Sequence, residues 1–216
     1  MNKIYEGNPI IKKHEMDHYF TIGDNAVAEF KDRGSKFLAY AFHLRDTNDF
    51  KNKLQEIKKE HPKATHFCFA YRIGADRGQF RVSDAGEPSG TAGRQILGQI
   101  DSKNLTNILV IVVRYFGGTL LGVPGLIKAY KTVSALVLQC TPVIRKDVQI
   151  HLQLQFNYTE MQEVMHIIKV FNCSILKNEL QLFCKMEIGI AMIKVNEVMA
   201  ALENIKNMEI HSLNKS

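Results

Sequence analysis

The sequence predicts an α+β protein of two domains, residues 1–140 and 141–216, on three observations. The chain has 216 residues, 45% hydrophobic and 23% charged, which is enough to bury a hydrophobic core. Residues 1–145 contain 21 Lys and Arg against 14 Asp and Glu, a net charge of +7, whereas residues 146–216 contain 7 Lys against 8 acidic residues, a net charge of −1. Thirteen of the 14 glycines and all five prolines lie in the first part, and Pro142 marks its end.

The first domain combines strand patterns with helix patterns. Five stretches alternate between polar and apolar residues or are continuously apolar, as strands are. They are residues 26–30, 36–44, 65–73, 80–82 and 108–114. Three stretches have apolar residues at helical spacing or follow a glycine-rich loop. The first helix follows Asp46 or Thr47 and ends at His61-Pro62, and the others span about residues 92–100 and 125–139.

The second domain shows the order strand, helix, strand, strand, helix, strand. The predicted strands are residues 148–156, 173–175, 180–190 and 208–213. The two helices are marked by apolar residues three and four apart, namely Met161, Val164, Met165 and Ile168, then Val195, Val198, Met199 and Leu202. A βαββαβ order over about 70 residues is typical of a ferredoxin-like sandwich.

Composition also indicates the compartment and the kind of partner. No run of 18 apolar residues is present, so we expect no contact with a membrane interior. The first residues lack the apolar core of a signal peptide, and the four cysteines form no C-x-x-C motif. We therefore expect a cytoplasmic protein with reduced thiols. A pI near 9.1 favours a polyanionic partner.

Two glycine-rich loops, each leading into a predicted helix, contain the candidate binding residues. Backbone N–H groups and the helix dipole at such places attract anions. Neither loop matches G-x-x-x-x-G-K-[ST] or G-x-G-x-x-G, which excludes a Walker ATPase and a Rossmann cofactor site. Alternatively, the glycines serve only tight turns and close helix packing. The candidate anion- or nucleic-acid-binding residues are Arg33, Lys36, Gly90, Thr91, Gly93, Arg94, Arg114, Gly117, Gly118 and Lys128.

Asp84 and Glu87, just before Gly90, form a candidate acid pair. Two carboxylates can bind a metal or activate water, but turn and capping roles also explain both residues. His66 and Cys68 share one face of a predicted strand and form a conceivable nucleophilic pair. Neighbours on one strand face rarely have the required geometry, so we interpret them as core residues. We therefore predict no metal and no cofactor, and we assign no catalytic residue.

Four segments together resemble the IMPACT (YigZ-type) family. They are Arg33-Gly-Ser-Lys-Phe37, His66-Phe-Cys-Phe-Ala-Tyr-Arg72, Ser83-Asp-Ala-Gly-Glu-Pro-Ser-Gly-Thr-Ala-Gly93, and Val112-Val-Arg-Tyr-Phe-Gly-Gly118 followed by Leu121-Gly122. The resemblance covers about residues 20–140, and the remainder is similar to the small C-terminal domain of bacterial members. The chain departs from the family pattern at two positions, with Ala85 in place of a second Asp and Pro124 in place of a frequent Gly.

The resemblance implies a first domain like domain 2 of ribosomal protein S5, with helices on one face of a mixed sheet. It implies a second, ferredoxin-like domain resembling domain V of translational elongation factors. Eukaryotic members bind the activator of a translation-stress kinase, so the resemblance implies a role in translation. We expect a regulatory binding protein rather than an enzyme, with RNA or the ribosome as partner of its basic first domain. Two alternatives stay open: a hydrolase of a phosphorylated or nucleotide substrate, and a protein–protein adaptor.

Overall fold

The computed structural model describes residues 17–179 and 183–213. They form two compact units that divide after Lys146, six residues beyond the expected boundary at residue 140. Strand β7 (Val143–Asp147) explains the difference, because it pairs with β1 (His18–Ile22). The N–H of Gly23 also donates to the carbonyl of Pro142 at 2.8 Å. The two paired strands were absent from the sequence prediction.

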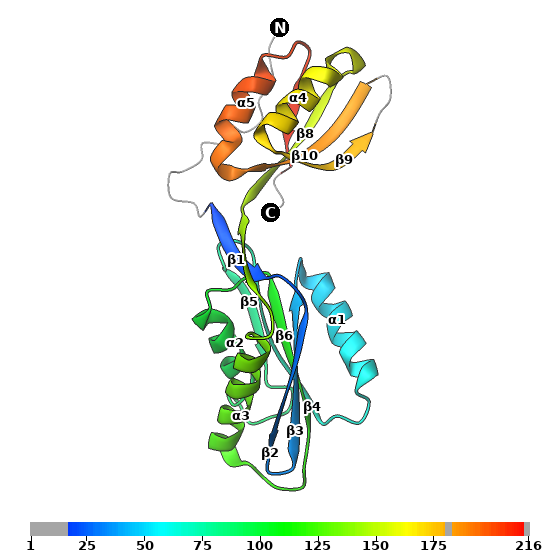
Figure 1. Ribbon diagram of the computed structural model, residues 1–216. Coiled ribbons are helices and arrows are strands. Elements are labelled where there is room, and N and C mark those ends of the chain that lie inside the picture. The colour runs from blue at the N-terminus through cyan, green and yellow to red at the C-terminus, as the bar shows by residue number, and fades with distance from the viewer. Residues whose placement is uncertain (1–16, 180–182, 214–216) are drawn as a thin grey trace. The chain divides into compact units, whose positions relative to one another are not determined.

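The first unit contains a five-stranded sheet in the order β2-β3-β6-β4-β5 (Figure 1). Its strands are β2 (Ala26–Asp32), β3 (Ser35–His43), β4 (His66–Ile73), β5 (Gln79–Ser83) and β6 (Ile108–Tyr115). Every neighbouring pair is antiparallel, so the mixed sheet implied by the family resemblance is wrong. The starts of β3 and β4 therefore lie beside the end of β6, and this end of the sheet carries the candidate site.

Helices cover both faces of this sheet, whereas the resemblance implied helices on one face. Helices α2 (Gly93–Ser102) and α3 (Gly122–Val137) pack on one face, and α1 (Thr47–Glu60) packs on the other (Figure 1). The central strand β6 explains this, because residues 108–113 are continuously apolar and present apolar side chains to both faces. In β4 as well, Cys68 packs toward α2 and α3 while Phe69 packs toward α1. The predicted α+β class is confirmed.

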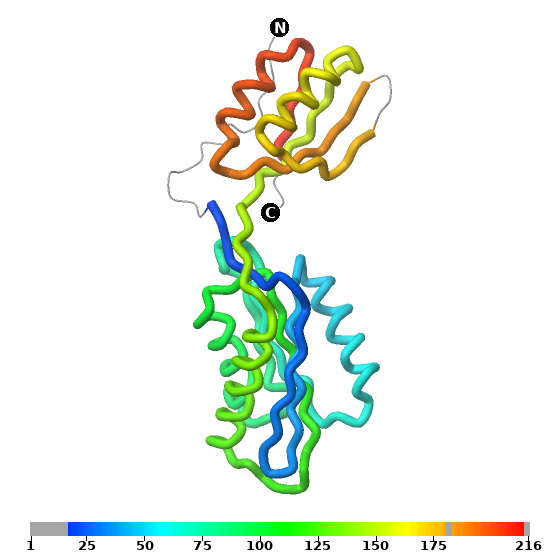
Figure 2. The backbone as a smooth tube through the Cα atoms, in the orientation of Figure 1, coloured from blue at the N-terminus to red at the C-terminus, as the bar shows by residue number. Residues whose placement is uncertain are grey.

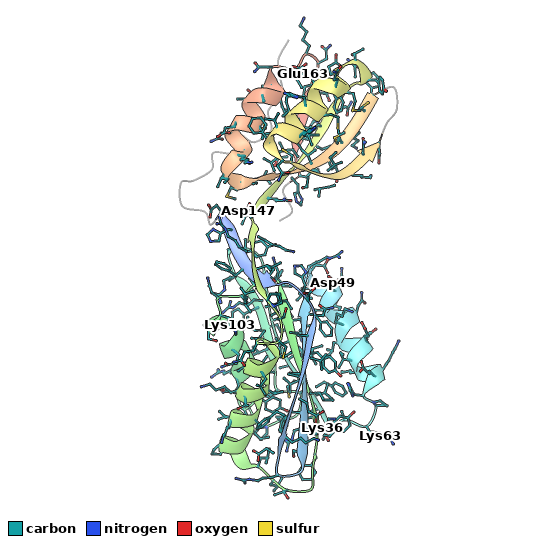
Figure 3. All side chains as sticks on the ribbon, viewed as in Figure 1. Lys36, Asp49, Lys63, Lys103, Asp147 and Glu163 are labelled. Carbon is teal, nitrogen blue, oxygen red and sulfur yellow. The ribbon has the colours of Figure 1, made fainter. Side chains whose placement is uncertain are left out.

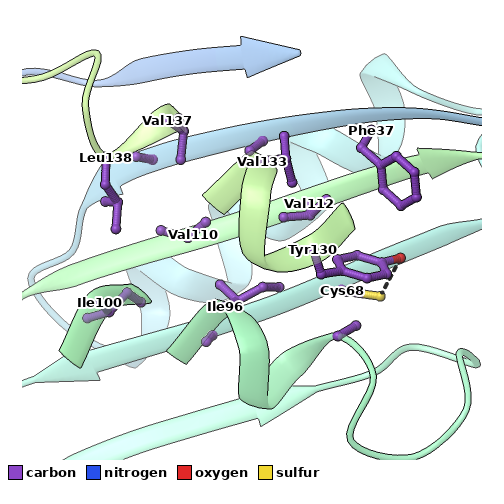
Figure 4. Packing of buried hydrophobic residues seen from close by; sticks show 14 of the residues in the cluster. Phe37, Cys68, Ile96, Ile100, Val110, Val112, Tyr130, Val133, Val137 and Leu138 are labelled. Carbon is purple, nitrogen blue, oxygen red and sulfur yellow. Dashed lines mark hydrogen bonds between the residues drawn. The ribbon is translucent and has the colours of Figure 1, made fainter. Parts of the chain in front are cut away.

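The core between the sheet and helices α2 and α3 includes one polar aromatic residue. Tyr130 of α3 is fully buried among apolar side chains of both helices and of the central strands (Figure 4). Its ring meets that of Phe37 edge-on, with centroids 5.3 Å apart. A buried tyrosine hydroxyl needs a hydrogen-bonding partner. Tyr130 therefore points to a polar group inside this core.

The second unit has the predicted βαββαβ order, which confirms that part of the fold. Its elements are β8 (Gln149–Asn157), α4 (Met161–Phe171), β9 (Ser174–Glu179), β10 (Phe183–Ala191), α5 (Val195–Glu203) and β11 (Glu209–Ser212), with short 3₁₀ turns at Tyr158–Glu160 and Met192–Lys194. The sheet order is β11-β8-β10-β9, and all pairs are antiparallel, as in a ferredoxin-like sandwich. Residues from α4, α5 and the strands share one apolar core.

None of the helices in the described part of the chain combines the length and apolar character needed to cross a bilayer.

Two backbone segments cross at contact distance beside the candidate site. The tight turn between β2 and β3 contains Gly34, and the loop after β6 contains Gly117, and the two lie side by side (Figure 2). A Cβ atom on Gly34 would lie 2.8 Å from the carbonyl oxygen of Gly117, and a Cβ on Gly117 would overlap the backbone of Gly34 and Ser35. Only glycine fits at this crossing.

We expect the Gly117→Ala substitution to destabilise the first unit by at least about 3 kcal/mol, because backbone must move to admit the methyl group. Native-state hydrogen exchange of the β6 amides would measure this free energy. Gly98→Ala is the matched control, since nothing lies within 4 Å of a Cβ at this position in helix α2. The control should be neutral or stabilising by up to about 1 kcal/mol. Equal effects of the two substitutions would contradict the crossing.

Candidate functional site

Both glycine-rich loops lie at the end of the sheet where β6 finishes. Arg114, near the end of β6, is in register with Phe37 of β3 on one side and with His66 of β4 on the other. The first loop, residues 84–92, leads from β5 into α2, and the second, residues 116–121, leads from β6 into α3. Antiparallel pairing therefore brings together segments more than 20 residues apart. We call this region the loop end of the first unit.

A buried ion pair joins the two loops. The Nη1 atom of Arg114 lies 2.7 Å from Oε1 of Glu87, and their side chains are only 6% and 3% exposed. The hydroxyl of Tyr130 donates to the same carboxylate oxygen at 2.8 Å. Ser35 Oγ accepts from Arg114 Nη2 at 3.4 Å and from the N–H of Gly117 at 3.3 Å. One charged centre thus joins four parts of the unit: strand β6, helix α3, the start of strand β3 and the first loop.

Asp84 binds the backbone at the start of helix α2. Its carboxylate accepts from the N–H groups of Gly90 at 2.9 Å, Ala92 at 3.0 Å and Gly93 at 2.8 Å. Burial would raise the pKa of Asp84, but these three hydrogen bonds and the charge of Arg94 outweigh it and hold the pKa below its ordinary value. The amides expected to bind an external anion therefore bind a carboxylate of the same chain.

The other residues of the first loop also make contacts within the chain. The hydroxyl of Thr91, a residue only 1% exposed, donates to the carbonyl of Pro88 at 2.7 Å. Gly93 lies against β5, because a Cβ there would be 2.8 Å from the backbone nitrogen of Ser83. These contacts fit the alternative that the loop residues serve turns and close packing.

The second loop differs from the sequence prediction at the helix start. Helix α3 begins at Gly122, three residues before the expected Gly125, with Pro124 in its first turn. Proline is well suited to this position, because the first N–H groups of a helix have no partner in the helix. Gly118 is exposed and has φ of +84°, a backbone conformation that favours glycine.

The five candidate cations differ in how far the structure exposes them. Arg33, Arg94 and Lys128 are exposed around the loop end. Lys36 is half-buried, points toward the opposite face of the sheet by strand alternation, and lies 2.8 Å from Glu29. The fifth cation, Arg114, is buried in the ion pair with Glu87. Three of the five side chains are therefore exposed at the loop end, while Lys36 is paired with Glu29 on the other face of the sheet.

Cys68 and His66 do not form a nucleophilic pair. Cys68 is fully buried, and its Sγ lies 3.0 Å from the carbonyl oxygen of Asp84 and 3.2 Å from the hydroxyl oxygen of Tyr130, the second contact being drawn in Figure 4. Burial raises the pKa of the Cys68 thiol to about 12, so it is protonated at neutral pH. His66 instead places Nδ1 2.9 Å from the carbonyl oxygen of Ala85. Both residues support the first loop.

Among the residues that the structure describes, no three His, Cys, Asp or Glu side chains are grouped to hold a metal ion. Asp84 and Glu87 each have hydrogen-bonding partners within the chain, as described above.

Sequence reasoning missed two residues of this region, Tyr130 and Phe116. Tyr130 lies in an apolar stripe with Leu126 and Val133 at helical spacing, so its hydroxyl could have been recognised as a group in need of a buried partner. Phe116 stands between the apolar strand β6 and the glycine pair. An aromatic residue between a buried strand and a glycine-rich loop is a signal for an exposed ring.

Comparison with known proteins identifies the relatives of the chain. The Impact N-terminal domain family matches residues 33–138. The chain is 31% identical over 181 residues to the IMPACT family member YigZ of Escherichia coli, covering 83% of this chain and 89% of YigZ. It is 34% identical over 163 residues to the IMPACT family member YvyE of Bacillus subtilis, covering 72% and 75%. A crystal structure of a hypothetical protein, 27% identical, matches with a TM-score of 0.74 over 94% of this chain and all of that one.

We expect Asp84→Asn to destabilise the protein by about 1 kcal/mol near neutral pH, since a neutral amide caps the helix start less well. Because the pKa of Asp84 is lowered in the folded state, its stabilisation is complete above the unfolded pKa of about 3.9 and is lost as the pH falls through the folded value. The stability difference between the two proteins should therefore shrink below about pH 4. Urea unfolding followed by tyrosine fluorescence would measure it. Asp76→Asn removes the same charge at an exposed turn and is the control for the change in net charge.

A double-mutant cycle would test the buried ion pair. Glu87→Gln should cost about 3–5 kcal/mol, because it leaves the charge of Arg114 buried without a counterion. Arg114→Met should cost a similar amount of stability, because it leaves the carboxylate of Glu87 buried without a cation. The double variant should be more stable than the sum of the single effects predicts, by more than about 1 kcal/mol. Hydrogen exchange of β6 amides would give the three free energies, and additive effects would contradict the pairing.

Proposed function

The chain belongs to the IMPACT family, and from that premise we propose that it is a translation-linked regulatory binding protein whose first unit binds RNA, alone or in the ribosome. Membership of the IMPACT family is the ground for the link to translation, because the resemblance to that family implies a role there. The nature of the ligand rests on the charge of the first unit, where residues 18–146 contain 19 Lys and Arg against 11 Asp and Glu, a net charge of +8. A polyanion is the partner that such a charge favours.

The observation that carries the proposal is the exposure of Arg33, Arg94 and Lys128 at one end of this unit. They come from three different elements, the β2–β3 turn, helix α2 and helix α3. The buried ion pair between Glu87 and Arg114 holds these elements in place, so the cations are presented by a fixed scaffold. A phosphate backbone can contact several such side chains at once.

We favour binding over hydrolysis because the carboxylates that a hydrolase would need are already bonded. Asp84 accepts three backbone hydrogen bonds, and Glu87 accepts from Arg114 and Tyr130. Since the amides of the first loop are bonded to Asp84, the proposed phosphate contacts are made by side-chain cations. Binding of that kind weakens steeply as the salt concentration rises.

We expect an RNA hairpin labelled with fluorescein to bind the full chain, with an affinity that falls steeply between 50 and 200 mM salt. Replacing Arg33, Arg94 and Lys128 together by Gln should weaken binding. It should also reduce the slope of log K against log[salt] by roughly 2, because about three phosphate contacts are lost. Fluorescence anisotropy over a salt series would measure both quantities.

A second triple variant controls for net charge. Arg45, Lys51 and Lys103 flank the opposite end of the sheet, where β3 ends and β6 begins, and Figure 3 shows Lys103 far from Lys36. Replacing these three by Gln removes the same charge but should leave the salt slope close to that of the wild type. Absence of binding at low salt, or equal effects of the two triple variants, would overturn the proposed function.

A further inference from the structure

We propose that Phe116 is a stacking platform for an unpaired RNA base, placed among the exposed cations of the loop end. This inference rests on the proposed function and specifies the form of RNA that the site prefers. Phe116 is 47% exposed at the start of the second loop, which is unusual for a phenylalanine that directly follows a buried strand. Aromatic rings beside cationic side chains are the common means by which proteins hold single-stranded nucleic acid.

The ring of Phe116 contacts Arg114, the cation of the buried ion pair. The guanidinium carbon of Arg114 lies 5.7 Å from the ring centroid, within the range of a cation–π contact. That guanidinium is itself fixed by Glu87 and Ser35. The next residue, Gly117, is locked against the backbone of Gly34. The ring is therefore presented with little freedom to lose on binding, which favours affinity.

Arg33, in the neighbouring turn, provides a second observation. Its φ is +46°, and that of Gly34 is +79°, so the two-residue turn has both central residues in the left-handed region. Asn-Gly is the favoured pair for such turns, and an arginine there is strained. Its side chain is nevertheless 62% exposed and lies only 4.0 Å from Asp32, in a surface contact of small energetic value. An exposed guanidinium in the turn whose Gly34 contacts Gly117, the residue after Phe116, suits a phosphate on the strand that carries the stacked base.

Exposed apolar side chains continue along the same loop. Leu120 is 82% exposed and Val123 is 50% exposed. A nucleotide has a base with an apolar face and a phosphate of opposite charge to the surrounding cations, so unpaired RNA satisfies both features of this surface. A protein partner would match the apolar side chains, but the charge of the unit favours the nucleic acid.

The chain supplies a control for the aromatic ring. Phe80 is 54% exposed and also lies beside an arginine, with the guanidinium carbon of Arg72 5.0 Å from its ring centroid. It belongs to the edge strand β5 and pairs in register with Arg72, six residues along β4 from His66. Phe80 therefore lies toward the opposite end of the sheet from Phe116, with similar exposure and a similar cationic neighbour.

Anisotropy titrations should compare a single-stranded RNA with a fully paired duplex of the same length. We expect Phe116→Leu to weaken single-strand binding by about 5- to 100-fold, the range found when one stacked base loses its ring. Duplex binding and the salt slope should change little, since the cations stay in place. Phe80→Leu should affect neither ligand.

A fluorescent variant gives a direct readout of stacking. The chain contains no tryptophan, so Phe116→Trp introduces a single indole whose emission a stacked base should quench. We expect quenching by the single strand, with affinity near that of the wild type, and no quenching with Phe80→Trp. If the wild type binds neither RNA, the proposed function fails and this inference fails with it. If RNA binds with a steep salt dependence but the Phe116 variants bind like the wild type and Phe116→Trp is not quenched, the stacking platform alone is overturned.

Discussion

The first unit is organised around the ion pair between Arg114 and Glu87. Removing two charges from water is costly, and their attraction compensates only when the other hydrogen-bonding groups are satisfied as well. Here Tyr130 donates to the carboxylate and Ser35 accepts from one guanidinium nitrogen, while Nε of Arg114 is buried without a hydrogen-bond partner among the described residues. Each of the four residues comes from a different element, which means that the ion pair forms only when the whole arrangement is in place. The positions of both glycine-rich loops follow from this requirement.

The first loop illustrates how a glycine-rich segment can look like an anion site and bind its own chain instead. Helix starts attract negative charge, and Asp84 provides that charge from within the loop. The result is a pre-formed surface with its backbone groups already used, on which only side chains are left to contact a ligand. We therefore expect a phosphate to be bound by cationic side chains and not by the backbone amides of the first loop. It also explains why the glycines of the loop are needed for close packing, as Gly93 against β5 shows.

Most of the secondary structure could be predicted from local patterns, because alternation and helical spacing record which face of each element is buried. The strands β1 and β7 were missed because each has only five residues, too few for a clear local pattern, and they pair with each other across more than 100 residues of sequence. Helices on both faces of the sheet could have been inferred from β6, which is continuously apolar over residues 108–113. Asp84 and Glu87 were proposed from the sequence as a candidate acid pair, but their hydrogen-bonding partners depend on strand register and could not be read from it. The same applies to Arg114, where sequence alone does not distinguish a buried counterion from a ligand contact.

The loop end combines a buried ion pair, Arg114 with Glu87, with some of the most exposed apolar side chains of the first unit. Stability explains the first feature, since an unpaired charge in the core would be costly, but it does not explain the second. An isoleucine or leucine gains nothing for folding at a fully exposed position, and Leu120 at 82% exposure buries little surface in the chain itself. The glycines around it would accommodate a polar residue equally well. Exposed apolar side chains on a rigid, charged scaffold are the arrangement expected when a partner buries those side chains. The rigid scaffold reduces the conformational freedom that is lost on binding.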